Sequence, residues 1–197
     1  MRFTILIILL ITLTTYIKQR TVEQVPEIVQ PVTMIVKDTI VQPPVAPSFL
    51  AGAEHINTGA TGPQELLAFA KTLIGTPYRY ASVDPAIGFD CSGFITYVFN
   101  HFKIAVPRSS IDFTNVERQV ELADAKPGDL VLFTGTDSTI RLVGHMGIIA
   151  SKENGEVHFI HSTSGKAYGV TISPLAKYYL SRFVKLIRIF PQNDIGN

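Results

Sequence analysis

The sequence has a single cysteine, Cys91, and no tryptophan among its 197 residues. One cysteine cannot form an internal disulfide, and it excludes a metal site built from several cysteines. Basic and acidic residues nearly balance, at 17 and 16, and there is no basic stripe or arginine-rich run. The absence of such a run excludes the usual nucleic-acid-binding surface. A hydrophobic content of 46% is sufficient for a packed core.

Charged residues are also absent from residues 3–17, a mostly apolar stretch that follows Arg2. Its length suits the core of a signal peptide and is short for a full membrane span. No small-residue cleavage pattern and no cysteine for lipid attachment stand near its end. We therefore expect residues 1–17 to be either a cleaved signal peptide or an uncleaved membrane anchor. The remaining alternative is a buried helix of the folded domain.

Prolines are frequent between residues 18 and 62, where Val-Gln-Pro occurs twice. Prolines at this density favour extended conformations and prevent regular strand pairing. We predict that residues 18–62 form a linker. It is either a tether that holds a domain away from a membrane or an ordinary spacer behind a cleaved signal. The compact domain is expected to span residues 63–191, followed by a short tail at 192–197.

The hydrophobic pattern changes its period within this domain. Helical spacing predicts helices over residues 64–74 and 91–102, and a short helix near 110–116. Alternating or short apolar runs predict strands over residues 129–134, 144–150, 156–161, 170–173 and 183–190. Asn154-Gly155 between two of these strands is typical of a hairpin turn. Helices followed by strands favour an α+β domain with an antiparallel sheet.

Cys91 lies where a turn-prone stretch passes into the second predicted helix, and Asp90 is a suitable cap for that helix. The positive end of a helix dipole favours the thiolate, which is the nucleophilic form of cysteine. A cysteine hydrolase also needs a histidine that moves protons and a group that orients it. His145 and His161, both at strand positions, are the candidates. Alternation along the strand places His161 on the same face as Val157 and Phe159.

Six short segments, in this order, resemble the NlpC-type cell-wall peptidases, which are papain-like cysteine hydrolases of bacterial peptidoglycan. The segments are 75–80 (GTPYRY), 89–94 (FDCSGF), 107–110 (PRSS), 127–130 (PGDL), 144–148 (GHMGI) and 160–162 (IHS). The resemblance covers nearly the whole predicted domain. It implies an α+β, papain-like fold, with N-terminal helices packed on a central antiparallel sheet and the nucleophile at a helix N-terminus.

The resemblance also implies the roles of individual residues. Cys91 would be the nucleophile, His145 the general base and acid, and His161 the polar residue that orients His145. Tyr78, in the loop before the nucleophile, would line the oxyanion site, with Tyr80 as a rival for that role. Neither a metal nor a cofactor is implied.

Asp90, Ser92 and Arg108 are further candidates for contact with substrate. Each also has a structural explanation, as a helix cap or as part of a surface ion pair. The chain departs from the family pattern at Ala81, where a Gly-Gly pair usually begins after the tyrosine loop. Phe113 stands near the place of a frequent glutamine. These departures concern the shape of the substrate groove more than the nucleophile.

The reaction implied is hydrolysis of a stem-peptide amide bond in peptidoglycan through a thioester. The expected bond joins the side-chain carboxyl of D-glutamate to a diamino acid. Two alternatives use the same fold: a wall-binding module without activity, and an amidase or acyltransferase acting on a different bond. Together with the N-terminal stretch, the resemblance predicts an exported protein of the bacterial periplasm or cell envelope.

Overall fold

The computed structural model describes residues 55–195, which belong to one compact unit. The predicted signal or anchor and most of the predicted linker lie outside the described residues. Within residues 55–195, no helix has the length and apolar character needed to cross a membrane.

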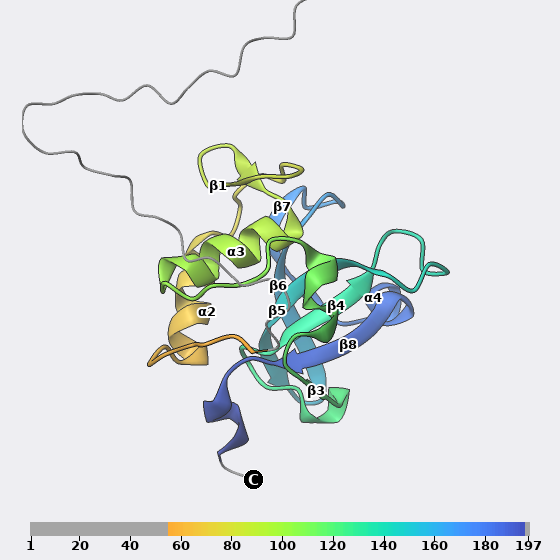
Figure 1. The fold of residues 1–197 in the computed structure, drawn as a ribbon. Helices are drawn as coiled ribbons and strands as arrows, with labels where there is room; N and C mark the ends of the chain where they lie inside the picture. The colour runs from red at the N-terminus through yellow and green to blue at the C-terminus, as the bar shows by residue number, and fades with distance from the viewer. Residues whose placement is uncertain (1–54, 196–197) are drawn as a thin grey trace, which may run out of the picture. The chain divides into compact units, whose positions relative to one another are not determined.

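A six-stranded, entirely antiparallel sheet forms the centre of the unit (Figure 1). Its spatial order is β3-β8-β4-β5-β6-β7. The strands are β3 (Arg118–Val120), β4 (Leu130–Thr134), β5 (Val143–Glu153), β6 (Glu156–Thr163), β7 (Gly169–Pro174) and β8 (Phe183–Arg188). The β5–β6 hairpin turns at Asn154-Gly155 with positive φ at both residues, as the sequence predicted. Five of these strands match predicted strands to within a few residues.

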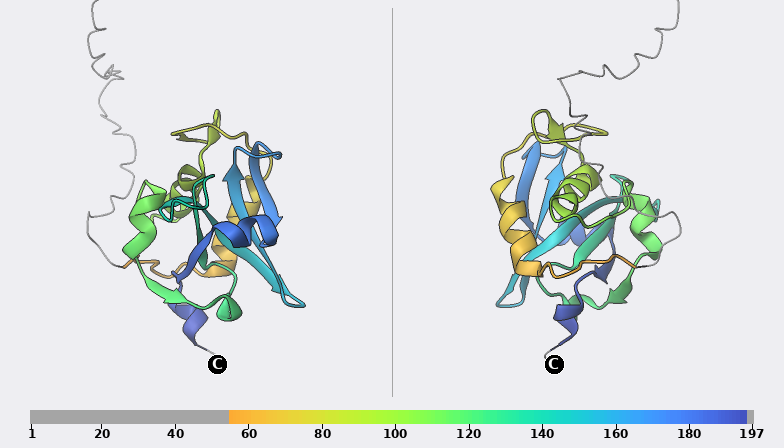
Figure 2. Two further views of the ribbon diagram at one scale, coloured as in Figure 1. Left: turned by 90° about the vertical axis from the view of Figure 1, so that its right-hand side faces the viewer. Right: turned by 60° about the vertical axis from the view of Figure 1, so that its left-hand side comes forward.

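Two helices, α2 (Pro63–Thr72) and α3 (Cys91–His101), pack side by side on one face of the sheet (Figures 1 and 2). Their apolar stripes meet buried side chains of β4, β5 and β8 in the larger of two hydrophobic clusters. Phe94, Ile95, Val98 and Phe99 of α3 are completely buried. Burial of each such side chain stabilises the fold by about 1.5–3 kcal/mol, compared with leaving the same side chain exposed to water. The predicted amphipathic character of both helices is confirmed.

The opposite face of the sheet carries a smaller cluster that includes Phe133, Phe159 and Leu186. Tyr179 of the short helix α4 (Lys177–Arg182) packs against it. Three 3-10 helices complete the unit: η1 (Ser110–Asn115), η2 (Leu122–Asp124) and η3 (Pro191–Asp194). Alpha-helix α4, strand β3 and the small hairpin of β1 (Val83–Asp84) and β2 (Gly88–Phe89) were not predicted.

The position of α3 is fixed locally by Asp90 and Gly93. The Asp90 carboxylate accepts a hydrogen bond from the backbone amide of Gly93 at 2.5 Å, which makes it the N-cap. A Cβ atom on Gly93 would lie 2.0 Å from the carbonyl oxygen of Ser82. Only glycine therefore allows the loop between Tyr78 and Ser82 to approach the first turn of α3.

The packed part of the chain is longer than predicted at both ends. Ile56 and Thr58, placed in the linker by the sequence, are buried, and Ile56 belongs to the larger hydrophobic cluster. At the other end, Asp194 pairs with Arg118 and with Arg188. Residues just outside the predicted boundaries at 63 and 191 thus contact the domain, and local composition does not reveal these long-range contacts.

Candidate active site

A cavity of about 1080 Å³ is lined by three of the residues that the sequence singled out for chemistry. Cys91 reaches it from the first turn of α3, His145 from β5, and Tyr78 from the loop before β1. The backbone amide of Met146, the residue after His145, donates a hydrogen bond to the Cys91 sulfur. The nucleophile candidate and the histidine candidate thus line one cavity although they are distant in sequence.

The two histidines form a hydrogen-bonded pair. His145 Nε2 lies 2.9 Å from His161 Nδ1, and His161 Nε2 lies 3.0 Å from the hydroxyl of Ser173 on β7. His161 is completely buried, on the same face as Phe159, as strand alternation predicted. Because Nε2 of His145 is occupied by His161, Nδ1 is the nitrogen of His145 that remains for the thiol.

Burial, followed by the negative charge of Asp90, raises the pKa of the Cys91 thiol to about 11. Hydrogen bonds from the backbone amides of Ser92, Met146 and Cys91 act in the opposite direction and are outweighed. The thiol lies at the helix N-terminus as predicted. The backbone amides at this position favour the thiolate, as expected, but burial outweighs them in the unliganded site.

Both histidines are held neutral. Burial lowers the pKa of His145 well below its usual 6.5, and the charges of His161 and Arg182 lower it further. Burial, followed by the charge of Arg182, lowers the pKa of His161 to about 3. A neutral thiol and a neutral imidazole therefore line the same cavity at rest, rather than a thiolate and an imidazolium.

Tyr78 and Tyr80, the two rivals for one role, lie in different surroundings. Tyr78 lines the cavity, and its pKa is raised first by burial and then by electrostatic interaction with Cys91 and Asp90. Its phenol therefore stays protonated and can donate a hydrogen bond. Tyr80 is 82% exposed and is not among the residues that line the cavity. The geometry favours Tyr78.

Asp90, Ser92 and Arg108 form one network behind the nucleophile. The Arg108 guanidinium donates from Nη2 to Asp90 Oδ2 at 2.8 Å and from Nη1 to Ser92 Oγ at 2.9 Å. Nη1 also donates to Asp90 Oδ1 at 3.1 Å. None of the three lines the cavity that contains Cys91. They hold the start of α3 in place, which agrees with the structural explanation given above for each of them.

The two departures from the family pattern have different consequences. Ala81 adopts a positive φ of 59°, a conformation that glycine accepts more readily than alanine. Phe113 is completely buried in the larger hydrophobic cluster. Phe113 therefore acts in the core and does not shape the cavity.

Sequence reasoning did not point to Ser173, Tyr179 or Arg182, which also line this cavity. Arg182 is 6% exposed, and its guanidinium donates to the carbonyl oxygens of Thr134 and Gly135, each at 2.8 Å. No carboxylate pairs with Arg182 among residues 55–195. Alternation along β7 was the available indication for Ser173, whereas nothing in the sequence marked the short helix that carries Tyr179 and Arg182.

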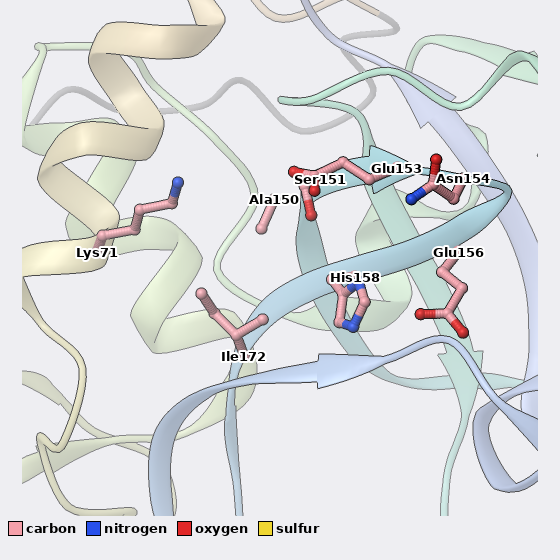
Figure 3. Close-up of a pocket in the computed structure, with 8 residues that line it drawn as sticks. All are labelled: Lys71, Ala150, Ser151, Glu153, Asn154, Glu156, His158 and Ile172. Atoms are coloured by element: carbon pink, nitrogen blue, oxygen red, sulfur yellow. The ribbon is translucent and has the colours of Figure 1, made fainter.

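A second cavity, of about 630 Å³, lies between α2 and the strands β5, β6 and β7 (Figure 3). Lys71 extends toward it from α2, and His158 and Glu156 face it from β6. None of the residues predicted to be catalytic lines this cavity. In the described part of the chain, no group of three or more histidine, cysteine or acidic side chains is placed to hold a metal ion.

Residues 75–188 match the NlpC/P60 family, and this match covers more than half of the sequence. The chain belongs to the NlpC/P60 family. Its fold is the papain-like α+β fold of that family, since a solved NlpC/P60 protein of Bacillus cereus superposes with a TM-score of 0.59 at 26% identity. That likeness covers 68% of this chain and 42% of the other.

Two curated relatives are similar to parts of this chain. Gamma-DL-glutamyl hydrolase of Bacillus subtilis is 31% identical over 129 residues, which are 66% of this chain and 30% of the relative. Peptidoglycan endopeptidase RipB of Mycobacterium tuberculosis is 37% identical over 101 residues, which are 51% of this chain and 38% of the relative. The chain thus spans between 30% and 38% of the length of these relatives.

Proposed function

We propose that the protein is a peptidoglycan hydrolase, a cysteine endopeptidase that cleaves an amide bond of the stem peptide. The observation that carries the proposal is the joint placement of Cys91 and His145 in one cavity, with His161 bonded to the far nitrogen of His145. Nucleophile, proton carrier and orienting group are the three parts that a cysteine hydrolase requires. The match to the NlpC/P60 family supports the same conclusion.

Because Cys91 and His145 are both neutral at rest, the first chemical step includes a proton transfer between them. Nδ1 of His145 takes the Cys91 proton as the sulfur attacks the amide carbonyl, so that thiolate and imidazolium form together with the new bond. The carbonyl oxygen becomes an oxyanion, and the Cys91 backbone amide and the Tyr78 hydroxyl are its donors. Loss of one such donor typically raises the barrier by about 3–4 kcal/mol.

The remaining steps return the site to its starting state. The imidazolium of His145 gives its proton to the leaving amine, the carbon–nitrogen bond breaks, and a thioester remains on Cys91. His145 then takes a proton from water, whose oxygen attacks the thioester. The acid is released, the sulfur recovers its proton, and no redox step is involved.

The charge of the cavity supports an acidic substrate. Lys166 and Arg182 line the cavity, and no aspartate or glutamate is among its lining residues. A stem peptide carries free carboxylates near its isopeptide bond, so it suits a cationic, acid-free cavity. The proposed scissile bond joins the side-chain carboxyl of D-glutamate to a diamino acid. The Bacillus subtilis relative is named gamma-DL-glutamyl hydrolase, which agrees with the gamma-glutamyl side of this bond.

The proposed place of action is the bacterial cell envelope. The apolar stretch at residues 3–17 supports export, either through a cleaved signal or with a retained anchor. Peptidoglycan would be accessible to the domain in both cases.

The test is digestion of purified muropeptides of defined stem sequence, with Cys91→Ala as the matched control. We expect a new amine on the diamino acid with the wild type and none with the variant. Equal product from both proteins, or none from either, would contradict the proposal. Binding to sacculi without turnover would instead indicate a silent wall-binding module. Product masses that match another cleaved or formed bond would indicate an amidase or acyltransferase.

A further inference from the structure

We propose that Ser173 is a positioning residue of this site, whose hydroxyl accepts the Nε2 proton of His161 and thereby fixes the tautomers of both histidines. This inference rests on the function proposed above. It starts from a continuous chain of contacts, since His161 is bonded at Nδ1 to His145 and at Nε2 to Ser173, at 2.9 and 3.0 Å. Both ring nitrogens of His161 therefore have a single, different partner.

The direction of this chain follows from the role of His145. A base that uses Nδ1 must carry its own proton on Nε2, and that proton points at Nδ1 of His161. Nδ1 of His161 must then be the acceptor, which places the His161 proton on Nε2. That proton needs an acceptor in turn, and the Ser173 oxygen is the atom within reach.

The alternative tautomer would disable the site. If His161 carried its proton on Nδ1, it would donate to Nε2 of His145, and the His145 proton would move to Nδ1. Nδ1 could then no longer accept the proton of Cys91. One hydroxyl on β7 thus decides between a productive and an unproductive arrangement of two imidazoles.

The residues around Ser173 favour its hydroxyl as the acceptor of the hydrogen bond from His161. Burial raises the pKa of the Tyr179 phenol, and the nearby hydroxyls of Ser173 and Thr163 act to lower it, so the serine hydroxyl has a second group toward which its own proton can point. The Tyr179 ring packs edge-on against His161 with 5.5 Å between ring centroids, and Phe159 lies against His161 at 4.6 Å. These rings restrict His161, so the imidazole cannot easily turn to find another acceptor.

The first experiment uses the wild-type protein. Long-range 1H–15N correlation spectra of histidine-labelled protein at pH 7.5 distinguish a protonated ring nitrogen from a bare one. We expect both His145 and His161 to carry the proton on Nε2, with assignments from His145→Gln and His161→Gln variants. A His161 proton on Nδ1 in the wild type would overturn the inference. This result does not depend on turnover, so it stays separate from a failure of the proposed function.

The second experiment removes the hydroxyl. In Ser173→Ala the buried Nε2–H of His161 loses its partner, and we expect kcat to fall about ten- to a hundredfold with KM unchanged. The Nδ1–H form of His161 should appear in the spectrum. Ser173→Thr keeps a hydroxyl and should restore both the tautomer and kcat. Ser181→Ala is the matched control, because it also removes one serine hydroxyl, but Ser181 is exposed, does not line the cavity and donates to the carbonyl oxygen of Tyr178.

Two outcomes of the second experiment would overturn the inference. One is a Ser173→Ala protein with the wild-type kcat. The other is a loss of kcat that occurs without a change of tautomer or that Ser181→Ala reproduces, which would mark a merely structural effect. If Ser173→Ala does not fold, the wild-type spectrum and Ser173→Thr still decide the question.

Discussion

The backbone amide of Met146 donates a hydrogen bond to the sulfur of Cys91. This bond joins the start of α3 to β5 and places the residue before Met146, His145, in the cavity with the thiol. The amide contact lowers the pKa of Cys91, yet burial and the charge of Asp90 prevail, and the pKa is raised to about 11. The thiol is therefore protonated at neutral pH, which is the state from which the proposed mechanism starts.

Alkylation of Cys91 should accordingly depend steeply on pH. With a pKa of about 11, the thiolate fraction and the rate of reaction with iodoacetamide rise about tenfold per pH unit between pH 7 and 10. The rate is measured by mass spectrometry of the labelled domain. Cys91→Ser removes the only cysteine and is the blank. A rate that is already at its plateau at pH 7 would show a thiolate–imidazolium pair and contradict this prediction.

Stability should fall as the pH drops below the ordinary histidine range. The pKa values of His145 and His161 are both lowered in the folded state, that of His161 to about 3, so the unfolded chain binds more protons below about pH 6.5. The free energy of unfolding then decreases toward acid, by about 1.4 kcal/mol per pH unit for each such proton. Urea unfolding between pH 7.5 and 5 measures this slope.

His161→Gln provides the comparison for this slope. It removes one of the two titrating groups, so the decrease of the unfolding free energy between pH 6.5 and 5 should be shallower by about 1.4 kcal/mol per pH unit. Above pH 7.5 the two proteins should show parallel pH dependence. Identical slopes for wild type and variant below pH 6.5 would mean that His161 is protonated in the folded protein.

The cationic lining of the cavity should govern substrate affinity. Lys166 lines the cavity and is exposed, so Lys166→Glu reverses one charge without disturbing the core. We expect KM for an anionic stem peptide to rise about five- to tenfold at low ionic strength, with less effect in added salt. Lys177→Glu, an exposed position on α4 that does not line the cavity, is the control with the same change of net charge. An equal effect of both variants would remove any specific role of Lys166.

Local patterns in the sequence were sufficient for the parts of the site that each element positions by itself. Asp90 is a residue type that commonly caps helices, and α3 begins at the next residue, Cys91. Strand alternation places His161 on the same face as Phe159. The contact between His145 and His161, in contrast, needs more than the hairpin at Asn154-Gly155, because a register shift between Ile149 and Ser151 is what brings both histidines to the same face of the sheet.

Other features depend on tertiary contacts that no local pattern reveals. Helix α4 has six residues, too few for a periodic pattern, and it brings Tyr179 and Arg182 to the cavity. The raised pKa of Cys91 follows from burial, and burial is a property of the assembled domain. For the same reason the roles of Asp90 and Arg108 could not be decided from the sequence, whereas their ion pair at 2.8 Å accounts for both.

At Ala81 the departure from the family pattern should lower the free energy of unfolding by a measurable amount. Its φ of 59° lies in the left-handed region, which costs a non-glycine residue about 1–2 kcal/mol. Glycine relieves this strain but gains about 0.5–1 kcal/mol of conformational freedom in the unfolded chain. We therefore expect Ala81→Gly to stabilise the domain by about 0.5–1 kcal/mol, measured by urea unfolding at pH 7.5. Ala86→Gly, at an exposed position in the β1–β2 turn without a positive φ, should destabilise it instead. If both substitutions destabilise the domain equally, the backbone at Ala81 carries no strain.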